Sequence, residues 1–178
     1  GAIGALYEVI EELDAIIEED FASTVRQVDA AFGECFQELF NGGTARLVLT
    51  DPDDLSTTGV EIIARPPGKR AQSLSLLSGG ERALTAVALL FALLRVNPVP
   101  FSFLDEVDAA LDEANVGRFR DLLLAHADRT QFVVITHNRT TVEAASTIYG
   151  ISMGEQGVSE CLSLKVEDPP QPAATTVA

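Results

Sequence analysis

Apolar residues recur at helical spacing from residue 3 to about residue 40. The first part is a heptad pattern with steps of three and four residues, formed by Ile3, Leu6, Ile10, Leu13 and Ile17. A broader apolar face follows, formed by Phe21, Val25, Val28, Phe32, Phe36 and Leu39. The pattern predicts one long helix, ended by Asn41-Gly42-Gly43 because these residues accept left-handed backbone. Residues 1–20 could be the end of a coiled-coil arm or the start of a plain amphipathic helix.

Two short runs rich in β-branched residues come next. Ala45–Thr50 and Val60–Ala64 predict strands, and the polar segment 51–59 between them predicts a hairpin. Pro66-Pro67-Gly68 then predicts a loop. The run Glu81–Val96 is apolar on most sides, which predicts a buried helix.

The order of elements then changes to strand, helix, strand. Phe101–Leu104 and Phe132–Thr136 are apolar runs typical of buried parallel strands, and a helix of roughly Asp112–His126 separates them. This order is a βαβ unit with a right-handed crossover. We therefore expect an α/β fold with a parallel-rich sheet flanked by helices.

The chain continues with a short helix near Thr141–Ser146 and two strands, Thr147–Met153 and Val158–Val166. Residues 168–178 are rich in Pro, Ala and Thr without an apolar pattern, which predicts a disordered tail. The predicted organisation is thus the neck helix of residues 1–20, a globular part over 21–167, and the tail.

Charge limits the partners of this segment. The chain has 178 residues, the usual size of one domain, and a formal net charge of −15. Such a charge argues against a grip on nucleic acid by this segment alone, since phosphates repel a net anion. Arg65, Lys69, Arg70 and Arg82 lie close together in the sequence, and they either face an anion or are ordinary solvated surface.

Cys35 and Cys161 are far apart, in segments that read as core helix and core strand. They form neither a disulfide framework nor a metal-binding spacing, so we expect two buried free thiols in a reducing compartment. No apolar run reaches the roughly 18 residues of a membrane span, and a cytoplasmic location is expected.

The segment Ser78-Gly79-Gly80-Glu81 combines two signals. Serine followed three residues later by glutamate is a helix capping box, which alone predicts only a helix start. Two consecutive glycines remove side chains from this point, so backbone N–H groups and the helix dipole can meet an anion. The segment therefore predicts a phosphate site.

Two adjacent carboxylates, Asp105 and Glu106, follow an apolar strand. An aspartate at a strand end can hold Mg²⁺ through water, and a neighbouring glutamate can polarise an attacking water. The alternative is a solvated pair in a loop. His137 follows the other strand of the βαβ unit, and parallel strands share their carboxyl edge, so we expect it beside Glu106. A lone histidine is more often structural, whereas a γ-phosphate contact is the functional alternative.

Asp112 can cap the following helix. A complete phosphate loop, Gly-x-x-x-x-Gly-Lys followed by Ser or Thr, is absent from the sequence. Gly68-Lys69-Arg70 is no substitute because it lacks the upstream glycine and the hydroxyl residue. The motifs thus predict half of an ATP site.

Together these motifs resemble those of ABC-type ATPase heads, most closely the bacterial-type SMC (structural maintenance of chromosomes) family. Leu74–Leu90 is similar to the signature motif, Phe103–Val116 to the Walker B motif and D-loop, and Val134–Asn138 to the switch histidine. The resemblance covers about residues 1–167 in the order and spacing of the family. It implies the C-terminal lobe of a split head, whose phosphate loop lies on an N-terminal lobe beyond two coiled-coil arms and a hinge.

The resemblance also implies roles for individual residues with ATP and Mg²⁺. Ser78, Gly79 and Gly80 would contact the γ-phosphate of ATP bound on an opposing head. Asp105 would support Mg²⁺, Glu106 would activate water and His137 would sense the γ-phosphate, while Asp112 would lie at the interface between heads.

The implied partners are the N-terminal lobe, a second SMC head in an ATP-dependent dimer, and a kleisin subunit docked on the last strands. DNA would be bound by the whole complex, without a membrane, in chromosome condensation and segregation. The isolated chain is expected to hydrolyse no ATP. Two alternatives stay open: a split-head ATPase of DNA double-strand-break repair, and a non-catalytic lobe that binds a kleisin.

Overall fold

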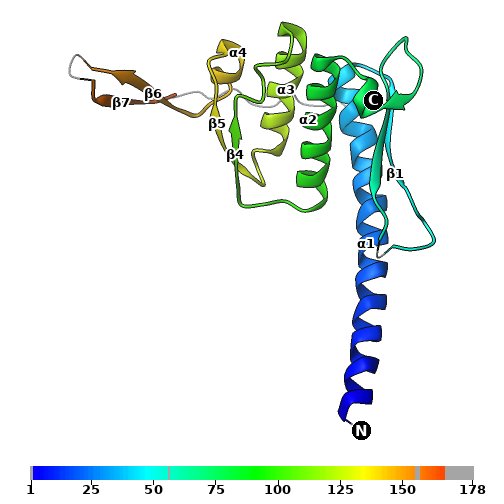
Figure 1. The fold of residues 1–178 in the computed structure, drawn as a ribbon. Helices are drawn as coiled ribbons and strands as arrows, with labels where there is room; N and C mark the ends of the chain where they lie inside the picture. Colours follow the sequence, from blue (N-terminus) through cyan, green and yellow to red (C-terminus); the bar gives the residue numbers. More distant parts are fainter. Residues whose placement is uncertain (1, 56, 155–156, 167–178) are drawn as a thin grey trace. The chain divides into compact units, whose positions relative to one another are not determined.

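A computed structural model describes residues 2–55, 57–154 and 157–166 of the chain (Figure 1). The chain divides into two compact units, Gly1–Pro98 and Val99–Ala178. The predicted disordered tail lies outside the described residues, and the predicted boundary after residue 20 stays a prediction. Among the described residues, no helix combines the length and apolarity that crossing a membrane requires.

The first unit is built on α1, Ala2–Phe40, which confirms the predicted long helix. Its C-terminal half buries Val28, Phe32, Phe36 and Leu39, whereas the heptad residues Leu6, Leu13 and Ile17 are exposed. Figure 1 shows α1 extending well past the part that lies beside β1 and α2. The apolar seam of the N-terminal half is thus uncovered in this chain.

The end of α1 requires glycine. Asn41, Gly42 and Gly43 all have positive φ angles, of 54°, 124° and 79°. A Cβ on Gly43 would lie 2.4 Å from the carbonyl oxygen of Arg65 and 3.1 Å from the ring of Phe36. The predicted helix stop is therefore also a close approach between two backbone segments.

The predicted hairpin is present as β1, Thr44–Leu49, and β2, Val60–Arg65, paired antiparallel from Thr44↔Arg65 to Leu49↔Val60. A strand of two residues, β3 (Gln72–Ser73), was not predicted and adds to β2. A 3₁₀ turn, η1 (Leu74–Leu76), leads to the next helix.

Helix α2, Gly79–Val96, begins earlier than the expected Glu81 because Ser78 is its N-cap. It packs on α1 and buries a stripe formed by Leu84, Val87, Ala88, Phe91 and Leu94. Its last turn is tied to α1 by Arg95, whose guanidinium lies 2.7 Å from Glu34 and 3.5 Å from Glu38. The two helices form the core of this unit.

The second unit opens with the predicted βαβ order: β4 (Phe101–Asp105), α3 (Glu113–His126) and β5 (Gln131–Ile135). The two strands are parallel, with Phe101 opposite Gln131 and Asp105 opposite Ile135. A single-turn helix, α4 (Arg139–Val142), is shorter and earlier than expected because Asn138 caps it.

The unit continues with β6 (Thr147–Met153) and β7 (Ser159–Lys165), which pair antiparallel as a ribbon. These strands confirm the last two predicted strands of the chain.

Three expectations are wrong. The sheets are not parallel-rich: among the described strands only β4 and β5 run parallel, since the other neighbours are joined by turns that reverse the chain.

The βαβ strands are not buried on both faces. Leu104 is buried, but the alternate residues Phe101, Phe103, Val133 and Ile135 are exposed. The pair has only two strands, and one of its faces is open.

Cys161 is exposed rather than buried, because its strand β7 belongs to a two-stranded ribbon with apolar side chains exposed along it. Cys35 is buried as expected.

Candidate functional site

The predicted capping box is present at the N-terminus of α2. The backbone N–H of Ser78 and its hydroxyl donate to Oε2 of Glu81 at 3.2 and 2.7 Å. Ser78, Gly79 and Gly80 are exposed. The N-terminus of an 18-residue helix therefore faces outward with glycines in its first turn, which suits an anion.

Gly79 is not required by packing within this chain. Apart from its two chain neighbours and the backbone of its own helix, no described atom lies within 4 Å of the position that a Cβ would occupy there. The free space above the helix start is therefore open to a molecule other than this chain.

Lys69 lies beside the same helix start. Its Nζ is 2.8 Å from Oε1 of Glu81, and its carbonyl accepts a hydrogen bond from Nε of Arg65. The Lys69 ammonium, and after it the Ser78 hydroxyl, lower the pKa of Glu81. Glu81 is thus held ionised, and Lys69, which the sequence left open, pairs with a residue of the signature segment.

Arg82, the last of the sequence-adjacent cations, donates from Nη2 to the carbonyl of Leu77 at 3.3 Å. It therefore braces the turn that leads into α2.

The acid pair lies in the second unit, where β4 ends. Asp105 is the last residue of the strand and Glu106 follows it; both are exposed. Glu106 has a φ of 47°, a left-handed conformation uncommon for a residue with a side chain. Its N–H donates to the carbonyl of Ile135 at 2.9 Å, and its carbonyl accepts from the N–H of Ala109 at 3.1 Å. These backbone bonds hold Glu106 against the end of β5.

His137 is exposed and lies just beyond the end of β5. Because β4 and β5 are parallel and Asp105 is opposite Ile135, the acid pair and the histidine leave the sheet at the same edge. This confirms the predicted shared edge, whereas the roles of these residues stay predictions.

Asp112 is the N-cap of α3, as predicted, and accepts hydrogen bonds from the backbone and side chain of Asn115 at 2.8 and 3.1 Å. It is exposed. Its predicted place at an interface is not tested by these contacts.

Sequence reasoning did not single out Asp108, which lies between the acid pair and the start of α3. This carboxylate is 2% exposed and accepts hydrogen bonds from the hydroxyls of Thr136 and Thr141. The available signal was an aspartate among small apolar residues between the acid pair and a helix. Its partners, which follow β5, could not be found without the fold.

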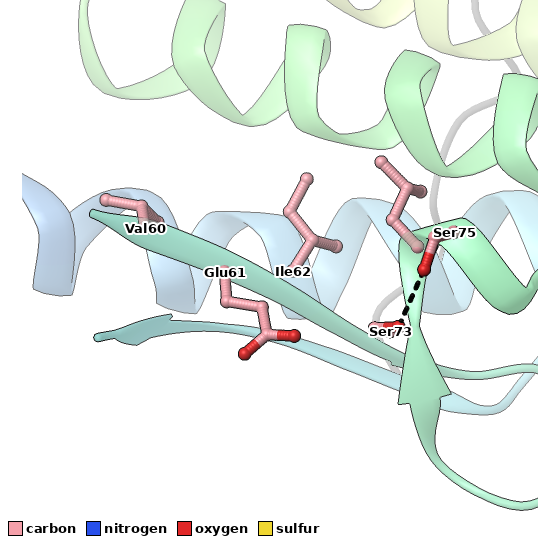
Figure 2. Close-up of a pocket in the computed structure, with 6 residues that line it drawn as sticks. Val60, Glu61, Ile62, Ser73 and Ser75 are labelled. Carbon is pink, nitrogen blue, oxygen red and sulfur yellow. Dashed lines mark hydrogen bonds between the residues drawn. The ribbon is translucent and has the colours of Figure 1, made fainter.

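The structure also has an open pocket of about 300 Å³ in the first unit, beside β2 and β3 (Figure 2). Its lining is formed by Val60, Glu61, Ile62, Ser73, Leu74 and Ser75. The hydroxyls of Ser73 and Ser75 are 3.0 Å apart. None of the predicted site residues lines this pocket.

The described residues contain no group of three or more His, Cys, Asp or Glu side chains placed to hold a metal ion. Asp105 alone still fits one mode of Mg²⁺ binding, in which one or two carboxylates, water and substrate phosphates share the ion.

Comparison with known proteins places the chain in a family. The protein-family model described as RecF/RecN/SMC N terminal domain matches residues 8–160 of the chain. The chromosome partition protein Smc of Bacillus subtilis is 55% identical over 167 residues, which are 94% of this chain and 14% of that protein. Smc of Desulfitobacterium hafniense is 56% identical over 163 residues, with 92% and 14% covered.

Solved SMC heads have the same fold. The Smc head of Pyrococcus furiosus, with an extended coiled coil and bound to the C-terminal domain of ScpA, gives a TM-score of 0.83 at 40% identity, over 90% of this chain and 40% of that chain. A structure from work on ATP-driven dimerization and DNA stimulated activation of SMC ATPases gives 0.76 at 41% identity, over 84% and 91%.

The fold and sequence therefore define part of an SMC-type ATPase head, and the chain belongs to the RecF/RecN/SMC family. It spans about 14% of the length of the curated chromosome partition proteins that it matches. The family model is described as an N-terminal domain, so the match does not confirm the expected C-terminal lobe.

Proposed function

We propose that the chain is the C-terminal, signature-bearing lobe of the ATPase head of a bacterial-type SMC protein. The observation that carries this is the parallel pair β4–β5, which delivers Asp105, Glu106 and His137 to one sheet edge. A lobe that grips the nucleotide would carry a phosphate loop, and the sequence has none. The motif content therefore supports the C-terminal lobe, complemented by an N-terminal one.

In this proposal the second unit performs the hydrolysis. Glu106 orients a water and accepts its proton as the water oxygen bonds to the γ-phosphorus. The bond from that phosphorus to the β–γ bridging oxygen breaks, which yields ADP and phosphate. His137 donates a hydrogen bond to a γ-phosphate oxygen. Asp105 is the residue that would hold Mg²⁺ through water, and the ion would supply charge neutralisation at the phosphate oxygens.

The first unit contributes to a different nucleotide. Ser78, Gly79 and Gly80 contact the γ-phosphate of ATP held on an opposing head, which the exposure of this segment and the open space at Gly79 support. Asp112 of the second unit lies at the interface between heads. ATP thus joins two heads, and hydrolysis releases them during chromosome condensation and segregation in the cytoplasm, on the nucleoid.

A kleisin subunit is the proposed partner of the β6–β7 ribbon and the surface around it. The ribbon exposes the large apolar side chains of Tyr149, Ile151, Met153, Leu162 and Leu164. This chain resembles SMC heads that were solved bound to domains of ScpA, and this likeness supports such a partner. DNA is assigned to the whole complex, because this segment carries a charge of −15.

The test is an ATPase assay on the isolated chain, the chain mixed with the N-terminal lobe, and the complete protein. We expect Mg²⁺-dependent turnover only where the phosphate loop is supplied. Turnover by the isolated chain would overturn the proposed division of the site. A complete protein that binds a kleisin but neither dimerises with ATP nor hydrolyses it would indicate the scaffold function instead.

A further inference from the structure

The carboxylate of Asp108 in the second unit is buried, unlike the other carboxylates near it. Asp105, Glu106 and Asp112 are exposed, whereas Asp108 is 2% exposed. A buried carboxylate is costly unless its oxygens accept hydrogen bonds. Oδ2 of Asp108 accepts two, from Oγ1 of Thr136 at 2.7 Å and from Oγ1 of Thr141 at 2.5 Å. The loop after β4 is thereby joined to the segment after β5.

These bonds hold the backbone on both sides of His137. Thr136, which precedes the histidine, donates to Asp108 and accepts the N–H of Asn138 at 2.9 Å. Asn138, which follows it, accepts the N–H of Thr140 at 3.0 Å and so caps α4. Thr141 fixes α4 to the same carboxylate. His137 is exposed, whereas Thr136, Asn138 and Thr141, which hold the backbone around it, are not.

The same loop holds Glu106. The N–H of Glu106 donates to Ile135, its carbonyl accepts from Ala109, and the carbonyl of Asp108 accepts from Leu111 at 3.1 Å. The left-handed φ of Glu106 persists because these contacts leave the loop few alternatives. Asp108 thus connects the turn that aims Glu106 with the turn that aims His137.

We propose that Asp108, with the hydroxyls of Thr136 and Thr141, is a positioning residue that keeps the His137 loop in register with the Glu106 loop for ATP hydrolysis. This inference rests on the proposed function. Asp108 touches neither nucleotide nor water in this role. One oxygen of its buried carboxylate accepts hydrogen bonds from two hydroxyls, and such bonds to a carboxylate are stronger than those between neutral groups.

The test uses the complete SMC protein and the variant Thr141→Val, which removes one hydroxyl at nearly constant volume away from the exposed site residues. We expect kcat per folded molecule to fall about tenfold or more, because small errors in the placement of reacting groups are costly. KM for ATP should change by less than kcat, because the phosphate loop that grips the nucleotide is assigned to the N-terminal lobe. Thr141→Ser keeps the hydroxyl and should recover most of the lost rate.

Thr130 supplies a matched control. It is also 2% exposed, and its hydroxyl donates to the carbonyl of Val99 at 2.8 Å, at the start of β5 rather than its end. Thr130→Val should lower the unfolding temperature about as much as Thr141→Val without lowering kcat per folded molecule. The folded fraction is measured by thermal unfolding. If valine at position 141 prevents folding, Thr141→Ala tests the same hydroxyl with less bulk.

A double-mutant cycle identifies the residue through which the network acts. In a His137→Ala background, Thr141→Val should change kcat by less than about twofold, because its effect runs through the histidine. The positioning role is overturned if the losses in kcat caused by Thr141→Val and His137→Ala multiply in the double variant. It is also overturned if Thr141→Val alone leaves kcat unchanged. Absence of ATP hydrolysis by the wild-type protein, or full turnover by Glu106→Gln, instead overturns the proposed function and this inference with it.

Discussion

At the scale of single residues, Glu81 links the start of α2 to a cation. Its Oε2 accepts both hydrogen bonds from Ser78, and its Oε1 pairs with Lys69. For Ser78 to donate its hydroxyl proton to a phosphate, that hydroxyl must rotate away from Glu81. The backbone bond to Glu81 and the Lys69 pair can persist during this rotation, so the helix start stays formed.

The variant Lys69→Met tests this pair. Lys69 lowers the pKa of Glu81, so the pair stabilises the fold above the ordinary glutamate pKa, and this stability is lost as pH falls through the lowered value. At pH 7 we expect the variant to lose about 0.2–1 kcal/mol of unfolding free energy, the range of exposed pairs. Urea unfolding at pH 7 and at about pH 3 should show a smaller difference in acid, because protonation of Glu81 removes the pair.

The control for that measurement is Glu81→Gln, which removes the charge but keeps the shape. In this background Lys69→Met should have no further effect at pH 7. An equal loss with and without Glu81 would assign the role of Lys69 to its methylene packing.

The positions of single side chains could be predicted where a strand end or a helix start decides them, as for the capping box of Ser78 and Glu81 and the N-cap Asp112. Asp105, Glu106 and His137 were found because parallel strands share an edge. Asp108 was missed, and the role of Lys69 was left open, because their partners come from other elements. Their interactions depend on which loops the fold brings together, and the sequence spacing carries no sign of that.

At the scale of elements, helix α1 depends on how it ends. Gly43 has a φ of 79°, and a Cβ there would lie 2.4 Å from the Arg65 carbonyl oxygen. Gly68 has a similar φ of 75°, but apart from its two chain neighbours no described atom lies within 4 Å of its Cβ position. Comparing an alanine substitution at each of these glycines therefore separates the free-energy cost of the backbone conformation from that of a clash.

We expect Gly43→Ala to lower the unfolding free energy by more than Gly68→Ala. The shared left-handed conformation costs about 1–2 kcal/mol with a Cβ, and only Gly43 adds a backbone clash. Urea denaturation of both variants measures the difference. Equal losses would show that β2 can move away from the end of α1 without cost.

The elements with a long apolar period could be predicted from the sequence, because burial of one face sets the spacing. Helix α1 is of this kind, whereas the β1–β2 hairpin and the strands of the βαβ unit were predicted from short runs of β-branched or apolar residues. Strand β3 has two residues and therefore no period. The burial of β4 was predicted wrongly, since a continuous apolar run fits equally a strand covered by its own chain and one with a face left for another polypeptide.

At the scale of the whole molecule, both units expose apolar surface. The first unit exposes the seam of α1, and the second exposes one face of β4–β5 and the β6–β7 ribbon. Groups of exposed apolar side chains commonly mark interaction sites. Within the proposed function they correspond to the companion coiled-coil arm, the N-terminal lobe and the kleisin.

Maleimide labelling of the two cysteines tests the burial of one side chain in each unit in a single experiment. Cys35 is fully buried, and burial raises its pKa to about 11 although Arg95 acts in the opposite direction; Cys161 is exposed. Because the thiolate is the reactive form, we expect a maleimide at pH 7 to label Cys161 in the native protein and Cys35 only after denaturation. Rapid native labelling of a Cys161→Ser variant would contradict the buried position of Cys35.

Hydrolysis and release of the heads are coupled in the proposed cycle, and Glu106→Gln separates them. Glutamine keeps the shape of the side chain but cannot accept the proton of the attacking water, so turnover of the complete protein should fall about 10²–10⁴-fold. Because Ser78, Gly79 and Gly80 still reach the opposing nucleotide, the heads should engage and fail to part. Cross-linking after Mg-ATP addition should show a longer-lived dimer, and adding Ser78→Arg should abolish it. An unchanged dimer lifetime would mean that release does not wait for the chemistry at Glu106.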